Sequence, residues 1–159
     1  MDAGTALPLE TSQGYSPPTV TQFSVFLTNK VGKLLDLVER FEGSPCTICA
    51  LSVHEASDHA VVRLITNNAL RARDVLRRQG LAFAENNVLV VELTEEHTLS
   101  SMCVCLLGAE LSIHFAYPLM IKPNGRPTIA LAVDDPQLAG QILRRKMFRL
   151  FGECDLPAA

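Results

Sequence analysis

The pattern of hydrophobic and polar residues changes its period several times along this chain, and each change marks a predicted element. Residues 22–27 (QFSVFL) are rich in β-branched and aromatic side chains, which favour a strand. Leu34, Leu37 and Phe41 then recur at helical spacing, with charged residues between them. Up to residue 93 the predicted elements are strand 22–27, helix 29–43, strands 47–55 and 60–66, helix 70–79, strand 82–85, a break at Asn86-Asn87 and strand 88–93.

The same β-α-β-β-α-β order then begins again, at an offset of 65 residues that becomes 67 further on. The matched pairs are Leu34 and Leu99, Val38 and Cys103, Phe41 and Leu106, Gly43 and Gly108, and residues 75–78 (VLRR) and 142–145 (ILRR). The change of offset falls in the turn 122–125, where insertions are tolerated. Matches at helix cores and helix ends indicate an internal duplication. The predicted elements of the second copy are strands 88–93, 111–122, 127–133 and 148–151 and helices 98–109 and 136–146.

From this order we expect an α+β protein of two ferredoxin-like βαββαβ repeats, each an antiparallel sheet with its helices on one face. The repeats are expected to be joined side by side, because no linker separates them. One continuous eight-stranded sheet would also remove two exposed edges. The expected domains are a flexible lead at 1–20, a first repeat at 21–87, a second repeat at 88–154 and a tail at 155–159.

Composition limits the classes of protein that fit this fold. The 159 residues are 48% hydrophobic and 19% charged, which supplies a core and argues against general disorder. A net charge of −3 gives no overall attraction to nucleic acid or to an anionic membrane. No run approaches the roughly 18 apolar residues of a membrane helix. The first 18 residues lack the basic and apolar segments of a secretory signal. We therefore expect a cytoplasmic protein whose five cysteines are reduced thiols.

The segment between the first strand and the first helix carries a family resemblance. Residues 28–34 (TNKVGKL) combine a polar residue, a variable pair, glycine, any residue and leucine, and so resemble the first loop of ACT domains. Residues 46–53 (CTICALSV) look like the second strand of that family, and residues 113–117 (IHFAY) resemble the same strand in the second copy of tandem ACT proteins. The resemblance extends over residues 21–153. It implies a regulatory, ligand-binding module, often for amino acids, without catalytic residues of its own.

In that family the ligand commonly lies where the first loop of one domain meets the second strand of a neighbouring domain. The amides of a helix N-terminus carry partial positive charge, and Gly32 has no side chain to shield them from a carboxylate. The predicted ligand-binding residues are Asn29, Lys30, Val31, Gly32 and Leu34 of the first loop, with Ser112 and His114 of the second copy. The alternative is that Gly32 only permits a tight turn and that Leu34 belongs to the core.

The matching loop of the second copy departs from this pattern. It reads Thr94-Glu95-Glu96-His97-Thr98, with His97 in the place of the glycine. Two carboxylates would repel an anionic ligand, and the imidazole would crowd the backbone. We expect this loop to differ from the first as a site: it is either structural or suited to a cation.

The remaining chemistry-bearing residues predict neither catalysis nor metal binding. The chain has no nucleophile elbow, no Walker-type loop and no HExxH grouping, so we expect it not to be an enzyme and to have no cofactor. Cys46 and Cys49 would point apart on a strand, as would Cys103 and Cys105 on a helix. This spacing favours buried thiols over a zinc site.

Basic residues on the second helix of each copy leave an alternative function open. Arg77 and Arg78 are matched by Arg144 and Arg145, and two such helix ends could follow phosphates in a nucleic-acid-binding module. A dimerisation module without any ligand is the other alternative. With the ligand-binding function we expect a homodimer and a regulated partner protein that the sequence does not identify.

Overall fold

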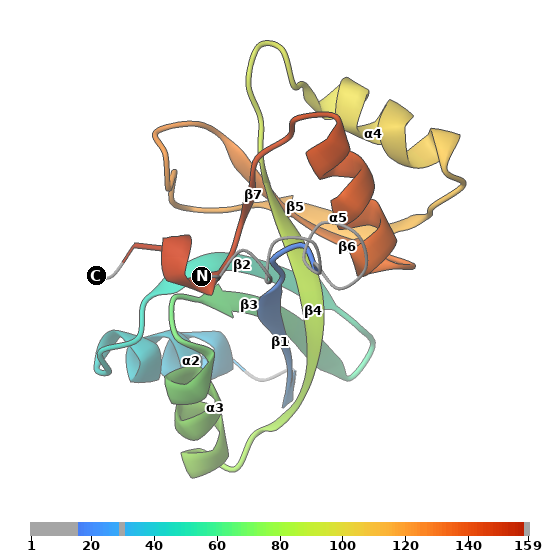
Figure 1. Ribbon diagram of the computed structural model, residues 1–159. Coiled ribbons are helices and arrows are strands. Elements are labelled where there is room, and N and C mark those ends of the chain that lie inside the picture. The colour runs from blue at the N-terminus through green and yellow to red at the C-terminus, as the bar shows by residue number, and fades with distance from the viewer. Residues whose placement is uncertain (1–15, 29–30, 158–159) are drawn as a thin grey trace.

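Strands and helices follow one another in the predicted β-α-β-β-α-β order, which occurs twice (Figure 1). The structure, a computed structural model, describes residues 16–28 and 31–157. Its elements are β1 (Val20–Thr28), α2 (Lys33–Glu42), β2 (Ile48–Glu55), β3 (His59–Thr66), α3 (Ala69–Arg78), β4 (Ala82–Glu92), α4 (Leu99–Gly108), β5 (Ile113–Pro118), β6 (Thr128–Val133), α5 (Pro136–Arg145), β7 (Leu150–Phe151) and a 3₁₀ turn at Glu153–Asp155. The fold class predicted from the sequence is therefore confirmed.

The predicted break at Asn86-Asn87 is wrong, because β4 runs without interruption from Ala82 to Glu92. Asn86 lies opposite Gln22 of β1, and its side-chain oxygen accepts a hydrogen bond from the Gln22 amide at 3.0 Å. Pairing within the sheet thus overrides the poor strand propensity of asparagine. Because the strands predicted at 82–85 and 88–93 are one, the described sheet has seven strands and not eight.

β4 belongs to both halves of the molecule: the first half runs from β1 to β4, and the second half runs from β4 to β7. Its residues 82–88 pair with β1, whereas residues 89–92 pair with β6. On the other edge, Val90 and Val91 also pair with β7. The strand order is β2-β3-β1-β4-β6-β5, and all neighbours are antiparallel. The sheet curls until its two ends approach, where the Met120 amide donates to the Cys49 carbonyl at 2.9 Å.

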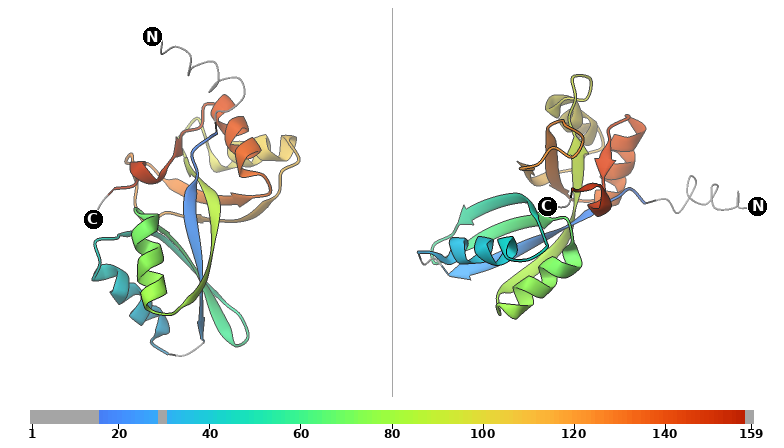
Figure 2. Two further views of the ribbon diagram at one scale, coloured as in Figure 1. Left: turned by 60° about the horizontal axis from the view of Figure 1, so that its bottom comes forward. Right: turned by 90° about the vertical axis from the view of Figure 1, so that its left-hand side faces the viewer.

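Three hydrophobic cores result from this curl, and the two helix pairs lie on the outside (Figure 2). α2 and α3 cover one face of the first half, and α4 and α5 cover one face of the second. The helix-free faces pack against each other and form the central core. Successive residues of β4 alternate between these cores, since side chains on a strand point to opposite faces. Leu89 packs under α4 and α5, whereas Val88 and Val90 face the central core.

A buried polar group joins the two halves inside the central core. Gln22 of β1 is fully buried, and its side-chain oxygen accepts a hydrogen bond from the Tyr117 hydroxyl of β5 at 2.5 Å. The amide of Gln22 donates to Asn86 of β4, as described above. The Tyr117 hydroxyl and the Gln22 side-chain oxygen therefore satisfy each other, and the Gln22 side-chain nitrogen is satisfied by Asn86, as is usual for buried polar groups. Tyr117 thus has a structural role, which the sequence could not distinguish from contact with a ligand.

Replacing Tyr117 with phenylalanine is expected to cost about 1–3 kcal/mol of unfolding free energy, because the Gln22 oxygen would stay buried without a donor. Burial also raises the pKa of Tyr117. Its contribution to stability is therefore complete below the unfolded value of about 10 and is lost as the pH rises above it. Urea denaturation at neutral and alkaline pH would measure both effects. Equal stability of the two proteins at neutral pH would contradict this account.

Segments at both ends of the described chain pack against the repeats. Pro17 is buried, and a Cβ added at Gly140 of α5 would lie 2.5 Å from its Cγ, so this glycine permits close contact. The last residue of the predicted lead, Val20, already belongs to β1. At the other end, a side-chain oxygen of Glu153 accepts a hydrogen bond from the Ala69 amide at 2.9 Å, which places a carboxylate at the start of α3.

Candidate functional site

The turn between β1 and α2 leaves the start of a helix uncapped. Gly32 is the N-cap residue of α2 and has a φ of 90°, in the left-handed region that favours glycine. Its carbonyl accepts the first helical hydrogen bond, from the Asp36 amide at 2.9 Å. A Cβ added at Gly32 would meet nothing within 4 Å. Apart from the chain neighbours of Gly32, no described residue therefore lies against this side of the helix N-terminus.

The other three described α-helices begin differently. Asn68, Thr98 and Asp135 are the N-cap residues of α3, α4 and α5, and each side chain accepts a hydrogen bond from an amide of the first turn. These bonds satisfy donors that a helix leaves unpaired. Gly32 has no side chain with which to do so. The first amides of α2 are thus suited to an oxygen that the N-cap residue does not provide, such as one from a bound carboxylate.

A cleft of about 230 Å³ adjoins this turn. It is lined by Leu27, Thr28, Lys33, Leu34, Val53, Glu55, Ala60 and Val62. Most of the wall is apolar, but one cationic residue (Lys33) and one anionic residue (Glu55) contribute to it. This combination suits a small zwitterion with an apolar side chain. The volume lies below the roughly 300–1,000 Å³ of pockets for drug-sized ligands, so the cleft suits a small ligand.

The structure separates the predicted ligand-binding residues into two groups. Val31 is fully exposed, and Leu34 is 37% exposed and lines the cleft, so the assignment of Leu34 to the core is wrong. Asn29 and Lys30 lie outside the described residues. Ser112 and His114 belong to the second half. There the Ser112 amide donates to Asp134 at 2.9 Å, and His114 Nε2 lies 2.9 Å from the same carboxylate.

Lys33, Val53 and Glu55 are site residues that the sequence did not identify. Lys33 directly follows Gly32 in the loop motif, and this place beside the glycine was the only feature of the sequence that pointed to Lys33 as a site residue. Val53 and Glu55 lie near the end of β2, more than twenty residues further along the chain. The pairing of β2 with β3, and of β3 with β1, brings them to the turn. Ser112 and His114 do not line this cleft, and their part in ligand binding stays a prediction.

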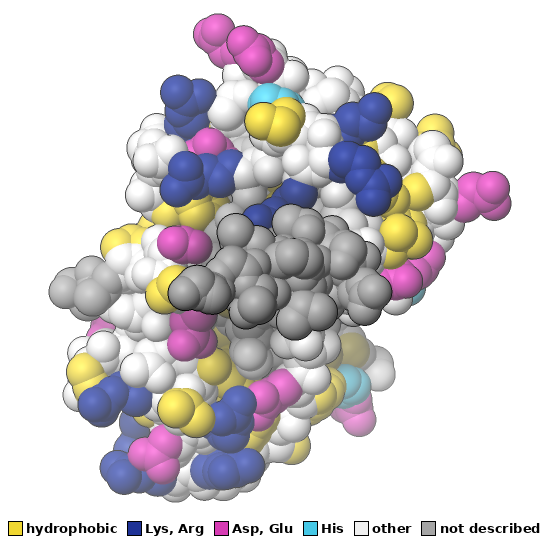
Figure 3. Space-filling view, in the orientation of Figure 1, with side chains coloured by type: hydrophobic (Ala, Val, Ile, Leu, Met, Phe, Trp, Pro, Cys, Tyr) yellow, Lys and Arg dark blue, Asp and Glu magenta, His cyan; other side chains and the backbone are white. Residues whose placement is uncertain are grey.

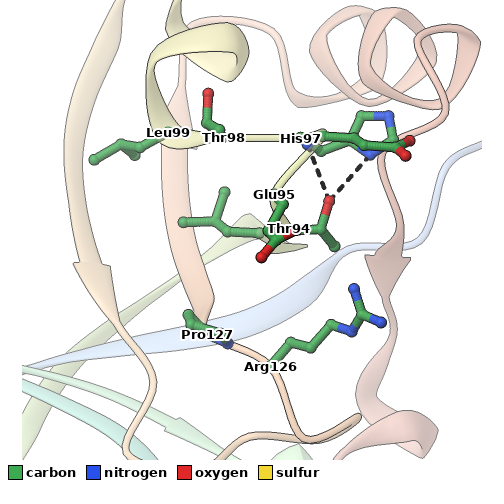
Figure 4. A pocket seen from close by; sticks show the side chains of 9 residues that line it. Thr94, Glu95, His97, Thr98, Leu99, Arg126 and Pro127 are labelled. Atoms are coloured by element: carbon green, nitrogen blue, oxygen red, sulfur yellow. Dashed lines mark hydrogen bonds between the residues drawn. The ribbon is translucent and has the colours of Figure 1, made fainter.

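The matching turn of the second half is closed by its own side chains (Figure 4). The His97 amide donates to Thr94 Oγ1 at 2.9 Å. His97 Nε2 lies 3.1 Å from the Lys146 carbonyl, which only accepts, so Nε2 carries the proton. The imidazole also packs on Phe148, with 4.8 Å between the ring centroids. These contacts give His97 a structural role at the position where the first turn has its glycine.

A wider cleft of about 950 Å³ lies beside this second turn. Glu95 lines it from the turn, and Arg126 lines it from the segment before β6 (Figure 4). Glu96 of the same turn lines it too. The amide of the first helical turn is already engaged, because Thr98 Oγ1 accepts from the Ser101 amide at 3.1 Å. The two turns therefore differ in chemistry: the N-cap residue of the first has no side chain that engages the helix amides, and the second offers charged side chains.

The cysteines and the basic helices do not form a further site. No group of three or more potential metal ligands (His, Cys, Asp or Glu) occurs among the described residues. Cys46 and Cys49 are buried as predicted, but Cys103 is exposed, because it lies on the outer face of α4. Arg73 of α3 forms two hydrogen bonds with Glu85, at 2.6 and 2.7 Å, and these bonds lower the pKa of the Glu85 carboxyl.

Arg78 pairs with Asp74 at 3.1 Å. At least part of the basic character of α3 is thus neutralised within the chain, which weakens the nucleic-acid alternative. None of the helices in the described ranges is long and apolar enough to cross a membrane.

Comparisons with known proteins bear on the fold of this chain. A family model described as an ACT domain pair matches residues 18–157. Protein BT0572 from Bacteroides thetaiotaomicron is similar in structure, with a TM-score of 0.76 and 20% sequence identity over 87% of this chain and 96% of that chain. The ligand-free regulatory subunit of aspartate kinase from Thermus thermophilus gives a TM-score of 0.55 and 8% identity over 80% of this chain and 91% of that chain. At these identities the likeness shows the fold alone. Among curated proteins, none matches the sequence.

Proposed function

This chain belongs to the ACT domain-pair family, and we propose that it is a regulatory protein whose ligand is an amino acid. The observation that carries the proposal is the N-terminus of α2, where Gly32 leaves the first helical amides without a side-chain cap and without a Cβ in front of them. A structural neighbour, the aspartate kinase subunit, is itself named as regulatory. No catalytic role is assigned to any residue.

The cleft accounts for each part of an amino acid. The carboxylate lies against the amides at the start of α2, where backbone donors and the helix dipole favour negative charge. Lys33 adds a cation on that side, and Glu55 provides an anion for the ammonium group. Leu34, Val53 and Val62 form an apolar wall for the side chain. Each of these contacts involves a different part of the ligand, so the site distinguishes amino acids from simple acids or amines.

Binding at this turn can regulate only if it favours one arrangement of the molecule. The cleft is formed by the ends of β1, α2, β2 and β3, so the ligand contacts α2 and the sheet at once. We propose that occupancy fixes α2 against the sheet and thereby changes the affinity for a partner protein or for a second copy of the chain. The five free cysteines suit the reducing cytoplasm, where we place the protein.

Thermal denaturation in the presence of each of the twenty amino acids tests this function. A ligand that binds only the folded state stabilises it by about 2.7 kcal/mol at one hundred times Kd. We expect one amino acid, or a few related ones, to raise the melting temperature. A short single-stranded RNA and zinc chloride serve as controls. No shift with any amino acid at millimolar concentration would contradict the proposal, and a shift with the RNA alone would favour a nucleic-acid-binding module.

A further inference from the structure

A separate cleft of about 330 Å³ lies between α2 and the end of α3. This α2–α3 cleft adjoins the cleft at Gly32, because Leu27 and Lys33 line both. Among the described residues that line it, Lys33, Arg40 and Arg78 carry positive charge and Asp36 carries negative charge. Lys and Arg side chains gather over α2 and α3 at the lower end of the space-filling view (Figure 3). The net positive charge of the lining favours an anion.

These cations are largely left without a partner by the described part of the chain. No ion pair joins Lys33 or Arg40 to another described residue. Arg78 pairs through one nitrogen with Asp74 at 3.1 Å, but both side chains are more than half exposed, and such pairs contribute little. The Arg78 guanidinium also has further N–H donors. All three cations can therefore serve a ligand in the cleft.

The cleft also holds a buried hydrogen-bond donor without an acceptor. Gln79, the C-cap residue of α3, lines the cleft. Its side-chain nitrogen Nε2 is buried and has no hydrogen-bond partner among the described residues. Buried polar groups nearly always have such a partner. An oxygen atom of a ligand in the cleft would accept this bond, so the donor and the charges call for the same kind of ligand.

The second half of the molecule fills the matching place with its own side chain. At the offset of 67 residues, Gln79 and Leu81 correspond to Lys146 and Phe148. These two are the residues that the His97 imidazole contacts, through the Lys146 carbonyl and the Phe148 ring. The first half has a glycine in the place of His97, and Gln79 and Leu81 line an open cleft instead.

The charges differ between the halves as well. The two basic residues at the end of α3 have basic counterparts on α5, as the matched sequences 75–78 and 142–145 show. By contrast, Lys33 and Arg40 of α2 are replaced by Thr98 and Cys105 at the offset of 65. Cations therefore converge from two helices only in the first half, which is also the half where the space is open.

We propose that the α2–α3 cleft binds a small molecule through a phosphate group. The residues that hold the phosphate are Lys33, Arg40, Arg78 and Gln79. A phosphate suits three cations and a neutral donor better than a carboxylate does, because it has more acceptor oxygens and a higher charge. The cleft is larger than the one at Gly32, so it leaves space for the rest of the ligand. The site does not rest on the proposed amino acid, since the arginines and Gln79 do not line the cleft at Gly32.

Calorimetric titration with inorganic phosphate at constant ionic strength tests the site. We expect wild-type protein to bind phosphate saturably. Arg40→Gln should weaken binding at least about tenfold, as the loss of a charge-assisted hydrogen bond does. Arg71→Gln is the matched control: Arg71 is likewise exposed but does not line the cleft, so this variant should bind like the wild type. No saturable binding by wild-type protein, or equal weakening in both variants, would overturn the proposal.

Nuclear magnetic resonance of ¹⁵N-labelled protein locates the phosphate independently. We expect the side-chain amide signal of Gln79 to shift as phosphate is added, and that of Gln141 on α5 to stay in place. Shifts that leave the Gln79 signal unmoved would refute the assignment. A short single-stranded RNA at the same concentration of phosphate groups should not reverse the shift. Its displacement of the phosphate would assign the site to nucleic acid instead of a small molecule.

Discussion

Replacing Leu76 with alanine is expected to lower the free energy of unfolding by about 2–5 kcal/mol, the usual range for a buried leucine. Leu76 is fully buried between α3 and the sheet of the first half, among residues that include Phe23 and Phe41. Such a core is closely packed, so the lost contacts would not be recovered by collapse of the neighbours. Leu143, 67 residues later, is fully buried in the matching place under α5, and we expect the same loss from Leu143→Ala.

The two variants together test whether the halves unfold as one unit. β4 pairs with β1 through residues 82–88 and with β6 through residues 89–92, so neither half can lose its sheet without disturbing the other. Each variant should therefore show one transition, with equal calorimetric and van't Hoff enthalpies. Differential scanning calorimetry would measure this. Two resolved transitions, of which Leu76→Ala shifts only one, would show that the halves unfold separately.

Replacing Gly32 with valine is expected to weaken amino acid binding by at least about tenfold, which corresponds to 1.4 kcal/mol. The valine side chain would occupy the space in front of the first amides of α2, where we place the ligand carboxylate. A Cβ added at Gly32 would meet nothing within 4 Å among the described residues beyond its chain neighbours, so the protein should still fold. A β-branched residue with a φ of 90° adds backbone strain of about 1–3 kcal/mol. The measurement is calorimetric titration with the amino acid that gives the largest thermal shift.

Gly125→Val separates the effect of strain from the effect on the ligand. Gly125 also has a positive φ, of 74°, and open space at its Cβ position, but it lies in the turn before β6 and does not line the cleft. We expect this variant to lose similar stability and to bind the amino acid normally. Equal loss of binding in both variants would assign the effect to strain, and full binding by folded Gly32→Val would remove the carboxylate from this turn.

Most of the fold could be predicted because the repeat places matched residues in matched environments. Leu37 and Phe41 are buried under α2, and Leu76 and Leu143 are buried at equivalent positions, as helical spacing requires. The fusion of two strands into β4 could not be predicted, because asparagine is a poor strand residue and the partner that stabilises Asn86 is Gln22, 64 residues away. The curl of the sheet likewise brings together residues that are distant in sequence, as the hydrogen bond from Met120 to Cys49 shows.

The candidate site shows the same limit. The loop motif identified Gly32, since a glycine at the start of a helix has a local physical meaning. It did not identify Val53 or Glu55, which reach the turn only through strand pairing. Cys103 was assigned to the core from its helical spacing, but α4 is apolar on its outer face too, so the pattern could not distinguish the two sides.

Because both halves share β4, the chain cannot lose one copy of the repeat and keep the other intact. A tandem pair joined by a linker can lose one copy and leave the other intact, because each copy keeps a complete sheet. Here the removal of either half would strip β4 of the partner along half its length and expose the apolar faces of Val88 and Val90 to water. Selection must therefore keep the two halves together, while the turns at Gly32 and His97, which lie outside the paired residues of β4, are free to diverge in chemistry.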